Sequence, residues 1–253
     1  MSDVLSQAAA SPRRTLVARL KRYPLLTAGL IYLGLVCIAF PSVALNPSVA
    51  IPGISGHPGD YSIFYWNIWW FQHAIFRLGQ TPYFTNFILY PHMLNLAYHT
   101  FAPFLDAMAI PFYAVLGLTA AVNTLMLGSL VFDGVAMFAF LRHHVTHFGL
   151  AFVGGLLFTF NSLTTVHLSM SHMGYLPIGW LPLALLACDR LIERKTVIAA
   201  VVLSGVVYAA LMTDSQFGLW LGLLLPPYAL YRWTRSARPV SYTHLTLPTI
   251  YSV

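Results

Sequence analysis

Charged side chains are scarce in this sequence of 253 residues, and their scarcity excludes a water-soluble fold. Charged residues make up 8% of the chain, whereas an average soluble domain has about 25%. Apolar residues make up 58%, and the mean hydropathy is +0.72. Several stretches of about 18 to 22 residues carry few or no charges, which is the length a helix needs to cross a bilayer. The sequence therefore predicts an all-α polytopic membrane protein whose main partner is the lipid bilayer.

Cysteines and nucleotide-binding motifs are also sparse or missing. Cys37 and Cys188 both fall in apolar stretches, so no disulfide framework is expected. The sequence has no Walker A loop, no Gly-x-Gly-x-x-Gly turn and no Cys-x-x-Cys pair, which argues against nucleotide hydrolysis and soluble dinucleotide chemistry. The net charge of +6 comes from short clusters beside apolar stretches. Such clusters set membrane topology, and they do not indicate nucleic-acid binding.

The basic clusters decide which apolar stretches span the membrane. They lie at 13–22, at Arg142, at 190–195 and at 232–238, and the positive-inside rule places all of them in the cytoplasm. The apolar stretches cover residues 24–45, 101–118, 120–141, 148–163, 175–190, 196–212 and 216–231. The second of these contains an aspartate and two prolines, so we expect a juxtamembrane or re-entrant helix there. About six transmembrane helices remain, with both chain ends in the cytoplasm of a bacterial cell and the chain in its inner membrane.

We expect the chain to have three regions. Residues 1–23 are expected to form a basic cytoplasmic N-terminus, and residues 24–239 the transmembrane region. Residues 240–253 read VSYTHLTLPTIYSV, which resembles one translated reading frame of a transposase sequencing adapter. We therefore expect this tail to be non-native, the natural protein to continue beyond it, and the fragment itself to be inactive.

A large external loop over residues 46–119 follows the first predicted span. Within it, Tyr61 to Arg77 is a helix-length stretch dense in tryptophan and tyrosine, which favour the headgroup level of a bilayer. We expect this stretch to lie along the membrane surface. The other outward connections are Asn161 to Gly174 and the very short Thr213 to Gln216.

Asp60 stands immediately before the aromatic stretch and is the residue best placed for chemistry. An aspartate at this position can cap the helix, which would be a sufficient structural reason for it. It is also the only carboxylate of the external loop before Asp106. A carboxylate at the outer bilayer surface suits general-base work, because partial burial can raise its pKa toward the operating range.

Several segments carry a family resemblance by their order along the chain. They are Gly59-Asp60 with the aromatic stretch, Phe87 to His92 with Asn95 to Tyr98, Asn123 with Leu141-Arg142, and His167 to His172 ahead of Trp180 to Leu183. Together with the basic N-terminus, the first span and the long loop, this order resembles glycosyltransferases of the GT-C superfamily, including family 39 and its bacterial relatives. The resemblance covers roughly residues 20 to 232.

The resemblance implies transfer of a sugar from a polyprenyl-phosphate-linked donor to an unknown acceptor on the periplasmic or external face. The family's loop aspartate corresponds to Asp60, which would act as the catalytic base. Many members have a second acidic residue in the next external loop, but Asn161 to Gly174 has no Asp or Glu. The residues expected to line the substrate cleft are His92, His99, His167, His172, Arg77 and Asp214.

Other functions remain open at this point. The spacing of His167 and His172 favours a loop, and these histidines lack zinc-ligand partners at a recognised spacing, so no metal ligand is assigned. A divalent metal stays an option, and no other cofactor is expected. Arg77 could hold a donor phosphate or be an anchor at the membrane surface. A transporter or flippase would use Asp133, in the middle of the second span, as its coupling residue. We favour a structural role instead, in which Asp133 is protonated and bonded to a neighbouring helix.

Overall fold

The computed structural model describes residues 22–52 and 60–236. The expectations for the N-terminal segment before residue 22, for Gly59 and for the 240–253 tail lie outside the described residues. The chain is mostly helical, with 76% helix and 2% strand, as the composition predicts. The α-helices are α2 (Pro24–Ala39), α3 (Pro41–Leu45), α4 (Tyr61–Phe76), α5 (Pro103–Leu116), α6 (Leu118–His144), α7 (Phe148–Thr159), α8 (Ser162–Ser169), α9 (Trp180–Arg194), α10 (Val197–Thr213) and α11 (Ser215–Ser236).

Short elements fill the connections between these helices. Strands β1 (Phe84–Thr85) and β2 (Leu94–Asn95) pair antiparallel, with Phe84 opposite Asn95. Two 3₁₀ helices, η1 (Leu96–Tyr98) and η2 (Met173–Tyr175), precede α5 and α9. The aromatic stretch that begins at Tyr61 is indeed a helix, α4.

Local sequence explains where the helices begin and end. Proline occupies the first position of α2, α3 and α5, where its missing N–H costs no helical hydrogen bond. Asn161 and Thr196 cap α8 and α10 by accepting a backbone N–H of the first turn. Gly117 has a φ of +82°, a conformation that glycine adopts easily, and it separates α5 from α6.

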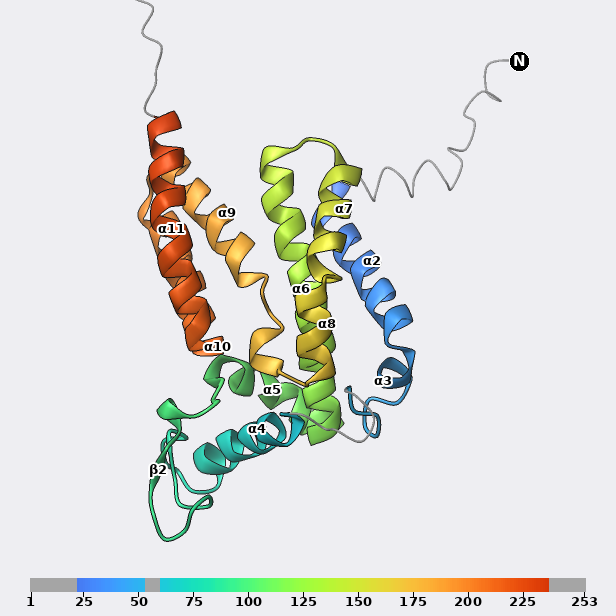
Figure 1. Ribbon diagram of the computed structural model, residues 1–253, viewed down its shortest axis with the longest axis vertical. Coiled ribbons are helices and arrows are strands. Elements are labelled where there is room, and N and C mark those ends of the chain that lie inside the picture. Colours follow the sequence, from blue (N-terminus) through green and yellow to red (C-terminus); the bar gives the residue numbers. More distant parts are fainter. Residues whose placement is uncertain (1–21, 53–59, 237–253) are drawn as a thin grey trace, which may run out of the picture.

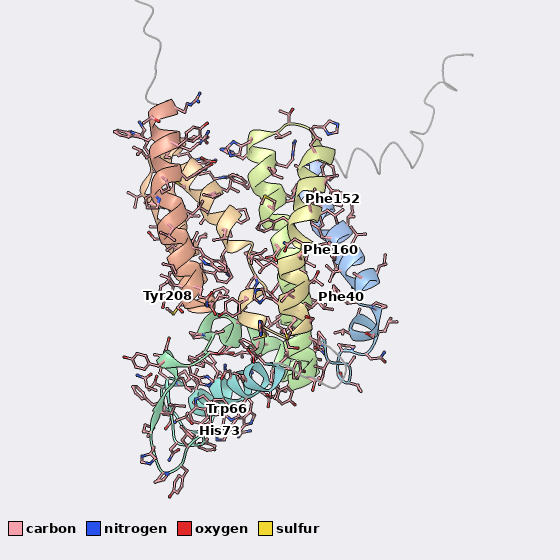
Figure 2. The ribbon with its side chains drawn as sticks, in the orientation of Figure 1. Phe40, Trp66, His73, Phe152, Phe160 and Tyr208 are labelled. Atoms are coloured by element: carbon pink, nitrogen blue, oxygen red, sulfur yellow. The ribbon has the colours of Figure 1, made fainter. Side chains whose placement is uncertain are left out.

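The long helices stand in two groups, and a third layer closes one end (Figure 1). Helices α2, α6, α7 and α8 form one group, and α9, α10 and α11 form the other. Contacts between α6 and α9 join the groups, while α4 lies across one end and packs on α5 and α6. Figure 2 places the side chains of Trp66 and His73 at that same end. We call it the α4 end, and we call the opposite end, where α6, α9 and α11 finish, the Arg232 end.

Basic residues are distributed unevenly between the two ends. Arg142, Arg194 and Arg232 lie at the finishing turns of α6, α9 and α11, at the Arg232 end. Arg77, at the C-terminal end of α4, is the only arginine or lysine between residues 23 and 141. Among the described residues, the fold thus brings together at one end the basic residues at Arg142, at 190–195 and at Arg232, which the sequence assigned to one side.

The number of spans is not confirmed. Among the described residues, two helices are long and apolar enough to cross a membrane, Leu118–His144 and Met173–Arg194. A third span results if α7 and α8, which bend by 40° at their junction, count as one. Helices α2 and α10 have 16 and 17 residues, about 24 to 26 Å, which is short of the roughly 30 Å hydrocarbon layer. Proline at position 41 limits α2, because it disfavours helical backbone at the residue before it.

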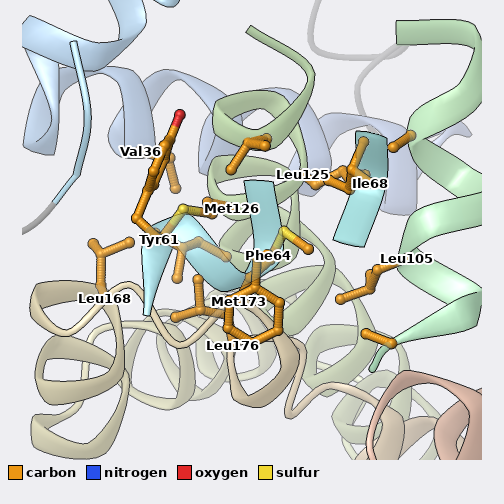
Figure 3. Packing of buried hydrophobic residues seen from close by; sticks show 14 residues of the cluster. Val36, Tyr61, Phe64, Ile68, Leu105, Leu125, Met126, Leu168, Met173 and Leu176 are labelled. Carbon is orange, nitrogen blue, oxygen red and sulfur yellow. The ribbon is translucent and has the colours of Figure 1, made fainter. Parts of the chain in front are cut away.

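A buried cluster at the α4 end holds α4 against the bundle (Figure 3). Phe64 and Ile68 of α4 pack with Leu105 of α5, Met126 of α6 and Met173 of η2. Helix α4 therefore buries one face in protein, including a fully buried Trp70 whose Nε1 donates to the Pro82 carbonyl oxygen at 2.9 Å. The aromatic side chains of α4 that face the bundle belong to the protein core, so they are not available to contact the bilayer interface.

Close packing of α7 on α6 gives the first testable prediction. A Cβ at Gly155 would lie 2.7 Å from the Gly134 carbonyl oxygen and would also clash with the Tyr32 hydroxyl. Small residues allow such approach between helices in a membrane. We expect Gly155→Ala to lower the free energy of unfolding by about 1–3 kcal/mol. The matched control is Gly205→Ala, since nothing lies within 4 Å of a Cβ there. Equal unfolding transitions of both variants in detergent would contradict this account.

Candidate functional site

Asp60 and two histidines form a connected chain at the α4 end. The Oδ2 atom of Asp60 lies 3.4 Å from Nε2 of His172, and the Nδ1 atoms of His172 and His167 lie 3.0 Å apart. The contact of His172 with Asp60 is an ion pair when the imidazole is protonated, and in the bond between the two histidines one Nδ1 donates and the other accepts, according to their tautomers. The three side chains therefore stand in a row of two successive contacts.

Tyr175 and the start of α11 extend this chain. The ring of Tyr175 stacks on His167 with centroids 4.9 Å apart, and its hydroxyl accepts a hydrogen bond from Nε2 of Gln216 at 2.7 Å. The carboxylate of Asp214 accepts the backbone N–H of Gln216 at 2.8 Å. A Cβ at Gly174 would lie 3.3 Å from Oδ2 of Asp214, so the glycine lets this carboxylate approach η2 closely.

The turn between α8 and η2 positions His172. Ser171 has a φ of +57°, which is uncommon for a residue other than glycine, and its hydroxyl donates to the Pro52 carbonyl oxygen at 2.7 Å. The backbone N–H of Asp60 donates to the Met170 carbonyl oxygen at 3.0 Å. These two bonds tie the entry into α4 to the residues next to His172. A strained backbone held by its surroundings is common at functional sites.

The capping interpretation of Asp60 is wrong. Asp60 occupies the position before the first turn of α4, but its side chain makes no capping hydrogen bond. Its carboxylate faces His172 instead and is 41% exposed. Helix α4 therefore gives no capping reason for an aspartate at this position.

A cavity of about 460 Å³ opens beside Tyr175. Its walls combine aromatic rings, backbone and polar side chains from the segment 83–103, from η2, and from α10, α11 and the turn between them: Tyr83, Ala97, Tyr98, His99, Thr100, Phe101, Pro103, Tyr175, Leu211, Met212, Asp214, Ser215 and Gln216. Aromatic faces beside hydrogen-bonding groups suit a ligand that carries both hydroxyls and flat apolar surface. The cavity is large enough for a small organic molecule.

The fold brings some of the residues expected in the cleft together and separates others. His167 and His172 join Asp60, while His99 and Asp214 line the cavity. His92 is exposed and lies outside the cavity wall. Arg77 lines a different cavity, at the C-terminal end of α4.

A further correction concerns the segment from Asn161 to Gly174. It is not a loop, because His167 lies on α8, and the turn that follows α8 brings His172 back to it. Sequence reasoning also missed Tyr175 and Gln216. The sequence contained a signal for both residues. Tyr175 follows His172 by three residues, and Gln216 ends the short connection from Thr213, which was predicted to lie on the same side of the membrane as His172.

The described residues contain no group of three or more His, Cys, Asp or Glu side chains placed to hold one metal ion. Asp60, His172 and His167 stand in a line of pairwise contacts, which does not direct three ligand atoms at one point.

Asp214 gives a pH-dependent prediction. Burial raises the pKa of its carboxyl above the usual 3.8, and the hydrogen bond from the Gln216 backbone offsets part of this rise. A raised folded-state pKa means that ionisation of Asp214 opposes folding, so this penalty is absent below pH 3.8 and grows as the pH rises through the raised pKa. Asparagine keeps the acceptor and carries no charge. We therefore expect Asp214→Asn to unfold at a higher temperature than the wild type at pH 7, with the difference vanishing near pH 4.

Unfolding temperatures in detergent between pH 4 and pH 8 would test the Asp214 prediction, with the adjacent Ser215→Ala as the control. The account of Asp214 would be wrong if the difference between Asp214→Asn and the wild type did not change with pH.

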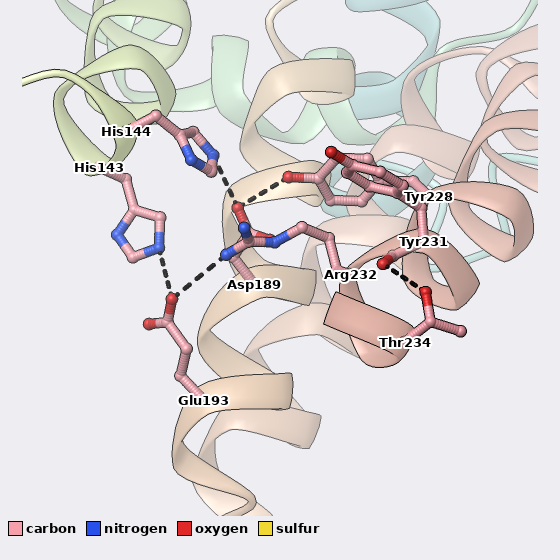
Figure 4. Close-up of polar contacts among 8 residues, drawn as sticks. All are labelled: His143, His144, Asp189, Glu193, Tyr228, Tyr231, Arg232 and Thr234. Carbon is pink, nitrogen blue, oxygen red and sulfur yellow. Dashed lines mark hydrogen bonds and ion pairs between the residues drawn. The ribbon is translucent and has the colours of Figure 1, made fainter. Parts of the chain in front are cut away.

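A second polar cluster lies at the Arg232 end (Figure 4). Asp189 of α9 is fully buried and faces Nε of Arg232 at 2.6 Å, Nε2 of His144 at 2.9 Å and the Tyr228 hydroxyl at 2.8 Å. Glu193, one turn further along α9, contacts His143 at 2.9 Å and Arg232 at 3.4 Å. The ion pair of Asp189 is therefore formed with Arg232, not with the adjacent Arg190. The cluster joins the ends of α6, α9 and α11.

Asp133 lies on α6 and is fully buried. Its Oδ1 accepts the backbone N–H of Gly179 at 2.7 Å, immediately before α9. A Cβ at Gly179 would lie 2.9 Å from Cα of Asp133, so α9 begins in close contact with α6. This hydrogen bond is the contact with a neighbouring helix that was considered for Asp133 from the sequence. The other carboxylate oxygen, Oδ2, has no hydrogen-bond partner among the described residues.

Comparison with protein families, with curated proteins and with solved structures found no match to this chain.

Proposed function

We propose that this chain is the transmembrane part of an integral-membrane glycosyltransferase, which moves a sugar from a polyprenyl-phosphate-linked donor to an acceptor at the external face of a bacterial inner membrane. The observation that carries the proposal is the contact chain of Asp60, His172 and His167 beside a cavity lined with aromatic rings. An exposed carboxylate backed by two imidazoles is suited to take a proton from an acceptor hydroxyl.

The distribution of basic residues supports the sidedness of the proposal. Basic residues collect at the Arg232 end, which the positive-inside rule assigns to the cytoplasm. The α4 end is then external, where a lipid-linked donor and a water-borne acceptor can meet. We infer six crossings, formed by α2, by α6, by α7 with α8, by η2 with α9, by α10 and by α11.

The proposed reaction is a displacement at the anomeric carbon of the donor sugar. The acceptor hydroxyl oxygen attacks the anomeric carbon of the donor sugar and forms a new C–O bond, while the bond from that carbon to the phosphate oxygen breaks and polyprenyl phosphate leaves. Asp60 accepts the hydroxyl proton as the new bond forms. His172, 3.4 Å from Oδ2 of Asp60, and His167, hydrogen-bonded to His172, hold the carboxylate in place, and the proton stays on Asp60 until it is released to water. Gln216 and Tyr175 offer hydrogen bonds to the sugar from the cavity wall.

A carrier that uses Asp133 is the alternative, and one observation favours it: Oδ2 of this buried carboxylate has no partner among the described residues. Sugar transfer from a radiolabelled polyprenyl-phosphate sugar, measured with the natural full-length protein in liposomes, separates the two functions. A glycosyltransferase forms a glycosylated acceptor and keeps its rate in Asp133→Asn, because asparagine retains the acceptor for the Gly179 N–H. Proton-coupled uptake without product, lost in Asp133→Asn, would instead establish a carrier.

A further inference from the structure

A second cavity, of about 520 Å³, lies at the C-terminal end of α4 and shares no residue with the first. It is lined by Trp69, Gln72, His73, Phe76 and Arg77 of α4 and its end and by Tyr113 of α5. The cavity walls therefore come from the layer that lies across the α4 end.

The cavity walls offer hydrogen-bond donors and one unbalanced positive charge. Arg77 has no ion-pair partner in residues 22–52 and 60–236. Nε2 of Gln72 is buried and has no hydrogen-bond partner in the same part of the chain. His73 and Tyr113 add a ring nitrogen and a hydroxyl, and no carboxylate is among the lining residues. A buried donor without a partner is costly, so this set of groups favours an anion with several acceptor oxygens.

The surroundings of the cavity are apolar and exposed. Phe76 is 64% exposed and Val115, two residues beyond Tyr113, is 81% exposed. Trp69 stacks on His73 with ring centroids 4.8 Å apart, which gives the cavity an aromatic wall. Tryptophan, tyrosine and arginine beside exposed apolar side chains are typical of the headgroup level of a bilayer. An anion that carries acyl chains can satisfy both the donors and the apolar rim.

We propose that this cavity binds the phosphate of an anionic phospholipid, with Arg77 and Gln72 holding the phosphate oxygens and Phe76 and Val115 contacting the acyl chains. The site is separate from the Asp60 chain, and it anchors α4 to the outer leaflet. It rests on the placement of the α4 end in a membrane, not on sugar transfer, so it can fail while the enzymatic proposal stands.

Photo-crosslinking tests the lipid site without measuring activity. The protein is placed in nanodiscs of phosphatidylcholine that contain a photoactivatable phosphatidylglycerol, and crosslinked peptides are identified by mass spectrometry. We expect adducts on residues 69–77 and 113–116. Arg77→Gln should lower them about tenfold, because it removes a charge-assisted contact, whereas Arg77→Lys should retain most of them. Arg194→Gln, at the exposed end of α9, removes the same charge elsewhere and should leave them unchanged.

Three results would overturn the phospholipid site. Equal labelling of wild type and Arg77→Gln would remove the role of the arginine. Equal labelling by photoactivatable phosphatidylcholine would show that an anionic headgroup is not selected. Displacement of the crosslinks by millimolar inorganic phosphate would identify a site for free phosphate.

Discussion

Asp60→Asn is expected to lower the rate of sugar transfer by about 10²–10⁴-fold, the usual effect of losing a positioned general base. Asparagine has nearly the same volume and cannot accept the hydroxyl proton. Because Asp60 is partly exposed and makes no capping bond to α4, the substitution should leave the fold intact. Initial rates at saturating donor, measured with the natural full-length protein in liposomes, give the comparison. The control is Ser62→Ala, which changes an exposed residue two positions along on α4.

The partnership of Asp60 with His172 adds a second readout to that prediction. If the two act as one unit, His172→Asn should slow transfer strongly, and the double variant should be hardly slower than Asp60→Asn alone. Independent losses that multiply would show that the 3.4 Å contact has no role in the reaction. An unchanged rate in Asp60→Asn would remove the proposed base altogether.

Arg232→Met is expected to lower the free energy of unfolding by about 3–5 kcal/mol, which is the cost of leaving a buried charge without its partner. Asp189 has 0% exposure, and of its partners Arg232, at 2.6 Å, is the one with a permanent positive charge. Unfolding of the purified protein in mixed detergent micelles measures the loss. Arg194→Met is the matched control, because Arg194 is exposed and has no ion-pair partner among the described residues.

A companion variant separates loss of the charge pair from loss of packing. Asp189→Asn combined with Arg232→Met removes both charges, so it should recover most of the stability that Arg232→Met alone loses. A loss below about 1 kcal/mol in Arg232→Met would be typical of an exposed pair, and it would contradict the view that this cluster joins α6, α9 and α11.

The sequence predicted the helical class and the α4 helix, because both depend on composition and local pattern. Tyr61 to Arg77 has helix-length apolar and aromatic character, and α4 covers Tyr61–Phe76. The gathering of basic residues at one end also followed from their spacing between apolar stretches. These features need no knowledge of which helix packs on which.

Features that depend on tertiary contacts could not be predicted in the same way. The pairing of His167 with His172 arises because a turn with a positive φ at Ser171 reverses the chain, and no spacing rule signals that geometry. The partner of Asp189 lies 43 residues away on α11, so local spacing does not identify it. The separation of Arg77 from the Asp60 chain likewise depends on the length and direction of α4, whose two ends carry the two sites.

Labelling of engineered cysteines in intact cells tests most directly the claim that Asp60 is displayed at the external water boundary. In a Cys37→Ala and Cys188→Ala background, Ser62→Cys reports on the start of α4 and Lys195→Cys on the opposite end. The account predicts that a membrane-impermeant maleimide modifies position 62 in intact cells, and position 195 only after the membrane is opened. Modification of position 195 but not position 62 in intact cells would place Asp60 in the cytoplasm and contradict the account.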